Sequence, residues 1–296
     1  IARKTCSPSR AFGPCNDFTG RKWFVAPGRT AIMESALSEI EFLALSPNRV
    51  AVLRRLAQEP HTRTDLVVAT GASQATLGRI LRDFEERSWI RRVEGGYVAT
   101  ATGTLVAEGF LDLLEIMEIE GELRPIVRYL PADELGFDLR RFADATITVP
   151  SGTKPNAPVK RVLDFLRSAT EVRVFSHAFN EGSLRVIEKR VSADEMTFEG
   201  VLSRSALDAV ADDAGLRRRL GSLLETSAAT VRVRDGEIPV AVTVADSVVH
   251  MLLRDENGIL QASVDTDDVA VREWARETFE TYWEAATPVD PDDLTH

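Results

Sequence analysis

A short segment around residue 78 carries side chains whose chemistry suits contact with the edges of DNA bases. Gln and Arg near the start of a helix can form paired hydrogen bonds to adenine and guanine, and Thr or Ala can meet a thymine methyl group. These side chains are Gln74, Ala75, Thr76, Arg79 and Arg82, and Ser73 before them can cap the helix and leave backbone N–H groups for a phosphate. We therefore predict a duplex DNA interface, and the alternative is a small helical domain whose Arg side chains form a solvated face.

A second group of candidate contacts follows closely in the sequence. Arg91 and Arg92 flank a tip formed by Gly95 and Gly96, which is small enough to approach a sugar-phosphate backbone. Residues 89–100 alternate in polarity on both sides of this tip, which predicts a β-hairpin.

The helices that must position these groups are predicted from hydrophobic spacing. We expect an amphipathic segment over 33–45, a helix over 49–59, a short helix from a Thr cap to Gly71 and a longer helix capped by Ser73. The inward face of that last helix is Leu77, Ile80, Leu81 and Phe84. Two helices joined by a Gly turn and followed by a hairpin form the layout of a winged helix-turn-helix, whose second helix enters the major groove.

The remainder of the chain changes rhythm after one long predicted helix, from Thr102 to about Tyr129. Beyond it, strands alternate with helices, and three consecutive strands suggest an antiparallel edge. The predicted strands are 172–176, 196–203, 230–234, 238–245, 248–254 and 259–264, and the predicted helices are 159–168, 182–192, 205–225 and 269–285. The expected fold class is a two-domain α+β and α/β chain, with an N-terminal winged helix, a linker helix and a C-terminal α/β domain.

These patterns divide the chain into five parts. They are a disordered leader (1–32), a winged helix-turn-helix domain (33–100), a linker or dimerisation helix (101–131), an α/β effector domain (132–287) and a disordered tail (288–296). A basic arm that reaches DNA is the alternative for the leader. Because a single recognition helix buries little surface, we predict a homodimer, with the linker helix as the seam; packing of that helix on its own chain is the alternative.

Charge is distributed unevenly over these parts. The net charge is −10, but residues 1–32 carry six basic and one acidic side chain, residues 33–100 carry nine of each, and the acidity lies beyond. Only five of the 36 basic residues are Lys, which fits either adaptation to high salt or a GC-rich genome. Both cysteines, Cys6 and Cys15, fall in the leader, and no apolar run could span a membrane, so we expect a cytoplasmic, soluble protein.

The stretch around Arg49 to Thr104 resembles the winged helix domains of archaeal regulators of the ArsR, MarR and TrmB type. From Asn48 to Gly103 it reads NRVAVLRRLAQEPHTRTDLVVATGASQATLGRILRDFEERSWIRRVEGGYVATATG. The C-terminal half, with Ser176-His177 and an ending rich in Trp and Tyr, is similar to the effector domain of halophilic archaeal regulators related to methanogenesis regulators. The resemblance implies a transcription regulator that binds double-stranded DNA, and a C-terminal fold like that of phospholipase D.

Catalysis by that C-terminal fold would need the pattern His-x-Lys-x-x-x-x-Asp. Neither His177 nor His250 is followed by Lys at the required place, and no Gly-x-Ser-x-Gly, P-loop or metal-spaced set appears. We expect no enzyme, no cofactor and no metal, and the alternative is a phosphodiesterase-like enzyme with an accessory DNA-binding domain. Polar residues at strand ends suit a ligand site, so Ser176, His177 and Arg204 are the candidate effector contacts. A domain that only mediates assembly is the competing hypothesis.

Overall fold

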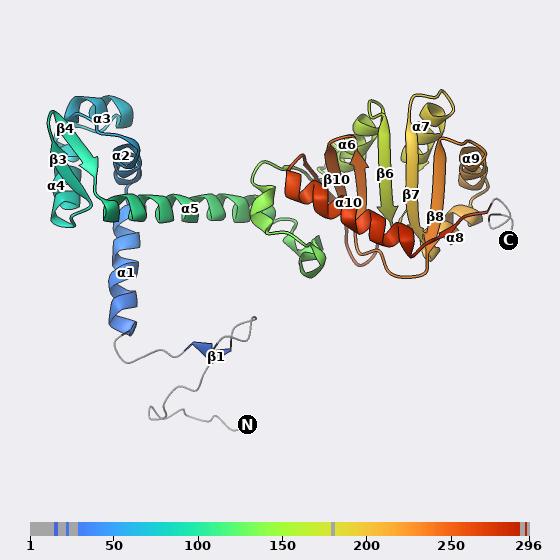
Figure 1. Ribbon diagram of the computed structural model, residues 1–296, viewed down its shortest axis with the longest axis horizontal. Coiled ribbons are helices and arrows are strands. Elements are labelled where there is room, and N and C mark those ends of the chain that lie inside the picture. The colour runs from blue at the N-terminus through green and yellow to red at the C-terminus, as the bar shows by residue number, and fades with distance from the viewer. Residues whose placement is uncertain (1–14, 17–21, 24–28, 179–180, 291–293, 295–296) are drawn as a thin grey trace, which may run out of the picture. The chain divides into compact units, whose positions relative to one another are not determined.

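The computed structural model describes residues 15–16, 22–23, 29–178, 181–290 and 294 of the 296-residue chain, with side chains from Ile32 onward. The chain divides into two compact units, Ile1–Leu114 and Glu115–His296, which are described separately (Figure 1). Within the described residues, no helix has both the length and the apolar character needed to cross a membrane.

The first unit has the predicted helix-turn-helix followed by a hairpin. Its elements are the short strands β1 (Cys15–Asn16) and β2 (Lys22–Trp23), the helices α1 (Arg29–Ala44), α2 (Pro47–Gln58), α3 (Arg63–Thr70) and α4 (Gln74–Glu86), the strands β3 (Ile90–Val93) and β4 (Gly96–Ala99), and the start of α5 (Ala101–Leu123). Leu53, Leu66, Leu77 and Phe84 are fully buried in one core between them. The predicted winged helix is therefore confirmed.

Local signals set the ends of the two central helices. The Thr62 hydroxyl accepts a hydrogen bond from the Asp65 backbone N–H, and the Asp65 carboxylate accepts one from the Thr62 N–H, which completes a capping box. Gly71 ends α3 in the left-handed conformation with φ of 65°, and the Ser73 hydroxyl accepts from the Thr76 N–H to begin α4. These caps fix the turn between α3 and α4, as the sequence predicts.

The helix α1 begins at Arg29, before the predicted start at Met33, and two arginines outside this helix pack against its C-terminal end. The guanidinium groups of Arg49 and Arg87 each lie 3.9 Å from the centre of the Phe42 ring, and Arg87 also pairs with Glu39 at 2.6 Å. The predicted disordered leader lies mostly outside the described residues.

The helix α5 ends earlier than predicted. It stops at Leu123, and the remainder of the predicted helix contains only a short 3-10 turn, Val127–Tyr129. Pro125 explains the difference, because proline has no backbone N–H and its ring clashes with the preceding turn of a helix.

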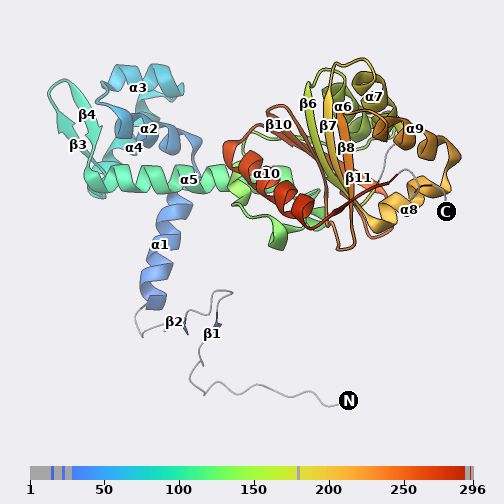
Figure 2. The ribbon, with the colours of Figure 1, turned by 45° about the vertical axis from the view of Figure 1, so that its right-hand side comes forward.

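The second unit is a mixed eight-stranded sheet, ordered β12-β8-β7-β6-β9-β10-β11-β5, with helices on both faces (Figure 2). The pairs β6–β7 and β7–β8 are parallel and the others are antiparallel. The strands are β5 (Thr146–Thr148), β6 (Glu171–Ser176), β7 (Thr197–Ser203), β8 (Ala229–Arg234), β9 (Ala241–Ala245), β10 (Val248–Arg254), β11 (Leu260–Thr266) and β12 (Thr287–Pro288). The helices α6 (Ala157–Leu166), α7 (Glu181–Val191), α8 (Arg204–Asp212) and α9 (Ala214–Leu224) cover one face, and α10 (Val269–Glu284) covers the other.

Three predictions about this unit are corrected. The helix predicted over 205–225 is broken at Asp213, whose carboxylate accepts from the Gly215 and Leu216 N–H groups and so caps a new helix. The short edge strands β5 and β12 have too few residues to show alternation. The tail predicted to be disordered from residue 288 instead pairs Pro288 with Arg232, and the Val289 side chain is buried in the core.

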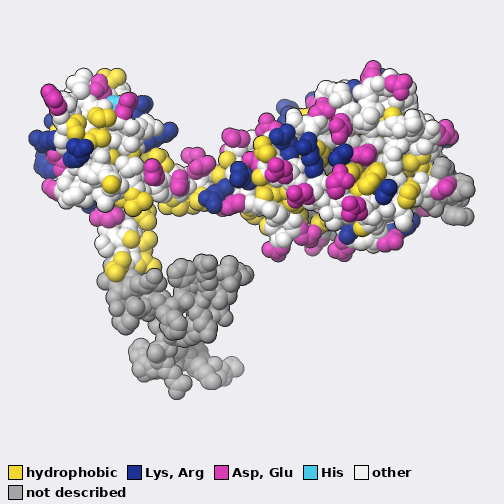
Figure 3. All heavy atoms as spheres, in the orientation of Figure 1, with side chains coloured by type: hydrophobic (Ala, Val, Ile, Leu, Met, Phe, Trp, Pro, Cys, Tyr) yellow, Lys and Arg dark blue, Asp and Glu magenta, His cyan; other side chains and the backbone are white. Residues whose placement is uncertain are grey.

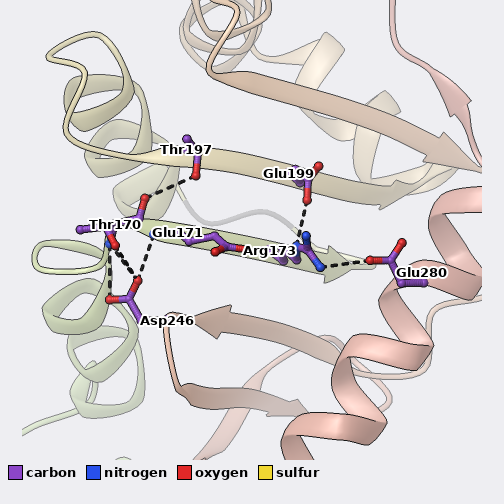
Figure 4. Close-up of polar contacts among 7 residues, drawn as sticks. All are labelled: Thr170, Glu171, Arg173, Thr197, Glu199, Asp246 and Glu280. Carbon is purple, nitrogen blue, oxygen red and sulfur yellow. Dashed lines mark hydrogen bonds and ion pairs between the residues drawn. The ribbon is translucent and has the colours of Figure 1, made fainter.

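Polar contacts connect the N-terminal parts of β6 and β7 with the turn between β9 and β10 and with α10 (Figure 4). The Asp246 carboxylate accepts hydrogen bonds from the Thr170 N–H, the Thr170 hydroxyl and the Glu171 N–H, each at 3.0 Å. Arg173 donates to Glu280 on α10 at 3.0 Å and pairs with Glu199 on β7 at 2.9 Å. Partial burial of Asp246 opposes ionisation, but the hydrogen bonds from Glu171 and Thr170 outweigh it and lower the pKa of Asp246.

Candidate nucleic-acid interface and ligand site

The exposed face of α4 contains all five predicted base-contact residues. Gln74, Ala75, Thr76, Arg79 and Arg82 are exposed. Leu77, Ile80, Leu81 and Phe84 are buried on the opposite side, as predicted. No ion pair within the described part of the chain includes Arg79 or Arg82, so their guanidinium donors face solvent.

Ser73 and Arg63 organise the first turn of this helix. The Ser73 hydroxyl is 2.9 Å from the Thr76 hydroxyl and caps the turn. Arg63, which the sequence analysis missed, donates to the Gln74 carbonyl at 2.8 Å. A Cβ at Gly78 would lie 2.6 Å from an Arg63 nitrogen, so the glycine makes room for this cation beside the exposed face. Glycine inside an otherwise amphipathic helix was the available signal.

The wing differs in part from the prediction. Arg91 is exposed, and no described carboxylate pairs with it. Arg92 donates to both oxygens of Glu85, at 2.8 and 3.2 Å, so its charge is already partly neutralised by α4. The sequence could not reveal this pair, since the hairpin brings the two residues together.

The two tip glycines have different roles. Gly95 has φ of 80° and open space around its Cα, which suits a turn that approaches another surface. At Gly96 a Cβ would lie 2.3 Å from the His61 carbonyl oxygen, because His61 pairs with Tyr97. The close approach of the His61 backbone therefore requires a glycine at position 96, and the contact of Gly96 with DNA stays a prediction.

Charges are arranged differently over the two units. Lys and Arg side chains gather at the outer edge of the first unit, whereas basic and acidic side chains are intermixed over the visible face of the second (Figure 3). A basic face is what neutralisation of DNA phosphates requires.

The candidate effector residues separate into two places. Ser176 is buried at the end of β6, where its hydroxyl donates to the Ala178 carbonyl at 2.6 Å, and His177 follows directly. Arg204 lies at the start of α8 and pairs with the exposed Asp235 at 3.1 Å. The cation near His177 is Arg254 of β10, which the sequence analysis missed because 77 residues separate the two.

The environment of His177 favours the neutral imidazole. Burial lowers the pKa of His177 and the charge of Arg254 lowers it further, against a hydrogen bond with the Ile238 backbone that raises it. The buried Nδ1 of His177 and the buried Nε of Arg254 have no hydrogen-bond partner. Beside Arg254 lies a cavity of about 50 Å³, whose lining includes Ser176 and Arg254 but not His177.

A buried polar cluster lies on the same face of the sheet. His250 contacts Asp265 through Nδ1, and Arg161 on α6 donates to Asp265 at 2.8 Å. Over the described ranges, no group of three or more His, Cys, Asp or Glu side chains could hold a metal ion.

Comparisons with known proteins agree with the two-domain organisation. Residues 37–122 match the family described as the HVO_A0261 N-terminal domain, and residues 155–285 match the middle domain of the methanogenesis regulatory protein FilR1. No curated protein matches the chain.

Solved structures also show similarity, at low TM-scores. The archaeal chromatin protein TrmBL2 is 17% identical, with a TM-score of 0.40 over 84% of this chain and 98% of that chain. Nuc from Salmonella typhimurium, a phospholipase D family member, is 14% identical, with a TM-score of 0.38 over 49% and 98%. NucT from Helicobacter pylori is 14% identical, with a TM-score of 0.39 over the same shares.

The resemblance deduced from the residues is thus confirmed by the family matches to both domains. The chain joins a segment similar to the HVO_A0261 N-terminal domain to a segment similar to the middle domain of the methanogenesis regulatory protein FilR1.

Proposed function

We propose that this regulator binds duplex DNA sequence-specifically, with α4 in the major groove and the β3–β4 wing against the backbone. The observation that carries the proposal is the set of exposed guanidinium groups on α4, which no described carboxylate neutralises. Arg79 is the candidate for paired hydrogen bonds to guanine, and Arg91 is the candidate for a phosphate contact.

The test begins with selection of preferred duplexes from a random pool by the full chain. Binding is then measured by fluorescence anisotropy over a KCl series, because phosphate contacts release counterions and make affinity fall steeply with salt. Arg91→Ala should weaken selected and random duplexes alike, whereas Arg79→Ala should weaken mainly the selected ones. Equal binding of both duplexes by the unmodified protein would contradict sequence-specific recognition.

We also propose that the protein acts as a homodimer joined through α1 and the first half of α5. In the first unit these helices border a groove of about 430 Å³, lined by Ile40, Leu43, Leu105, Phe110 and Leu113 among others. Further large apolar side chains are exposed on both helices, namely Ile32, Met33, Leu37 and Leu114. A second copy of the chain is the proposed partner for this surface, because helix-turn-helix proteins commonly bind two half-sites on DNA as two-fold symmetric dimers.

Light scattering at several concentrations tests the dimer. Leu37→Glu should yield monomers and weaken binding to a two-half-site duplex, since Leu37 is 56% exposed and its replacement leaves the core intact. Val68→Glu is the matched control, because Val68 is 79% exposed on α3. Dimers that survive Leu37→Glu unchanged would place the interface elsewhere.

For the second unit we propose a non-catalytic effector domain that tunes DNA affinity. The support is a cavity lined by Ser176 and Arg254, with His177 next to Ser176 in the chain, together with the absence of Lys at the required place after either candidate His. A ligand can shift DNA binding only through its differential affinity for two states, typically about 5–150-fold. Phosphodiesterase turnover that disappeared with His177→Ala would instead favour an enzyme.

A further inference from the structure

Arg254 is one of several arginines of the second unit whose buried Nε has no hydrogen-bond partner, and unlike Arg232 and Arg272 it lines a cavity. One of its guanidinium nitrogens donates to the Gly258 carbonyl at 2.8 Å. No carboxylate within the described ranges forms an ion pair with it. The neighbouring Asp255 carboxylate accepts instead from the Asn257 and Ile259 N–H groups.

This arrangement has an energetic consequence. Removing a cation from water without a counter-charge is costly, and an anion supplied from outside the chain would offset that cost. Burial also lowers the pKa of the Arg254 guanidinium, which nevertheless stays protonated at neutral pH. Burial is the main reason that the pKa of His177 is lowered, and the charge of Arg254 lowers it further.

The adjoining cavity limits the size and character of such an anion. It lies between the sheet and the helices α6 and α7, and its volume is about 50 Å³. Ser176 and Arg254 are on its polar side, and Ile187, Leu202 and Ala241 supply apolar wall. A space of this size has room for a carboxyl group with a short aliphatic stub, whose polar end would face Arg254.

We infer that this cavity binds a small aliphatic carboxylate, of the size of acetate or propionate, through the guanidinium of Arg254. The guanidinium N–H groups donate to the carboxylate oxygens, and the aliphatic stub contacts the wall at Ala241. The inference rests on the proposed sensing function for its biological meaning, but binding itself is independent of DNA.

Isothermal titration calorimetry on the full chain tests the site with acetate and propionate as probes. For ligands this small we expect a Kd on the order of 0.1–1 mM. The neutral isosteres acetamide and propionamide, and inorganic phosphate, should not bind. Arg254→Gln should weaken carboxylate binding at least about 10-fold, because it removes a charge-assisted hydrogen bond. Arg167→Gln is the matched control and should bind normally, because Arg167 pairs with the exposed Asp164 and does not line the cavity.

A second variant guards against a folding defect in Arg254→Gln. Ala241→Val keeps the guanidinium and fills the cavity, so it should abolish carboxylate binding while leaving the ligand-free melting temperature equal or higher. Equal binding of amides and carboxylates, undiminished binding by Arg254→Gln, or no carboxylate binding at all would overturn the inference.

Operator binding separates this inference from the sensing function. Carboxylate binding that leaves DNA affinity unchanged would support the site and refute sensing through it. A different small molecule that changes DNA affinity, while no carboxylate binds, would support sensing and refute the site.

Discussion

The two domains use the same residue type, arginine, in opposite ways. On α4 and the wing, Arg79, Arg82 and Arg91 are exposed and lack described carboxylate partners. In the α/β domain, Arg161 pairs with Asp265 and Arg219 with Glu188, each linking two elements of the fold. The N–H groups of an unpaired guanidinium are free to donate hydrogen bonds to a ligand, whereas those of a paired guanidinium donate to carboxylates of the same chain. Exposure and pairing therefore distinguish candidate contact residues from structural ones.

Arg92 and Arg254 are exceptions to this difference between the two domains. Arg92 belongs to the DNA-binding domain, yet it is paired with Glu85. Arg254 belongs to the α/β domain, yet it has no described carboxylate partner.

The largest expected effect concerns the ion pair between Arg161 and Asp265, in which the carboxylate is buried. Arg161→Met should lower the free energy of unfolding by about 2–3 kcal/mol in urea denaturation, because the Asp265 carboxylate is only 4% exposed. The control is Arg204→Met, whose partner Asp235 is 84% exposed, and its loss should be below about 0.5 kcal/mol. Equal losses in the two variants would show that pairing in this domain has no burial-dependent value.

Next in size is the exposed recognition residue. Arg79→Ala should reduce affinity for the selected duplex about 10- to 100-fold, corresponding to the loss of one paired contact to a base. Its unfolding free energy should change by less than about 0.5 kcal/mol, because the side chain is exposed. If Arg79→Ala were destabilised but still discriminated between selected and random duplexes, Arg79 would be a structural residue and not a base contact.

A smaller effect is expected at the turn between β9 and β10. Asp246→Asn keeps an acceptor and a residue type that tolerates the φ of 51°, but it removes the charge. We expect a loss of about 1 kcal/mol at pH 7, already reduced for the exposure of this side chain. Because the folded pKa of Asp246 is lowered, the charge stabilises the fold above the unfolded pKa near 3.8. The difference between the two proteins should therefore shrink as pH falls from that value through the folded pKa, as denaturation over a pH series can measure.

The smallest effect separates the two arginines of the wing. Arg91→Ala should weaken binding to any duplex about 5-fold, and Arg92→Ala about 2-fold, because Glu85 already holds Arg92. Anisotropy also reports the salt slope, which should fall more for Arg91→Ala. A larger effect for Arg92→Ala would mean that DNA displaces Glu85 from its partner.

The sequence by itself determined the features that depend on neighbouring residues. Ser73, Gly71 and the period of Leu77, Ile80 and Phe84 specify the recognition helix, because caps and amphipathic spacing act within a few residues. The end of α5 at Leu123 depends equally on a nearby residue, Pro125, although the sequence prediction extended this helix to about Tyr129. Likewise, the strand predicted over 248–254 is found as β10, whose residues 249–253 are all buried.

Only the tertiary structure decided which charges are neutralised. Glu85 lies on α4 and Arg92 on β3, and the fold alone brings them within 2.8 Å. Arg254 and His177 are far apart in the chain and meet because β6, β9 and β10 are neighbours in one sheet. Whether a guanidinium is paired depends on such long-range contacts, and these follow from strand order and helix packing rather than from residue type or spacing.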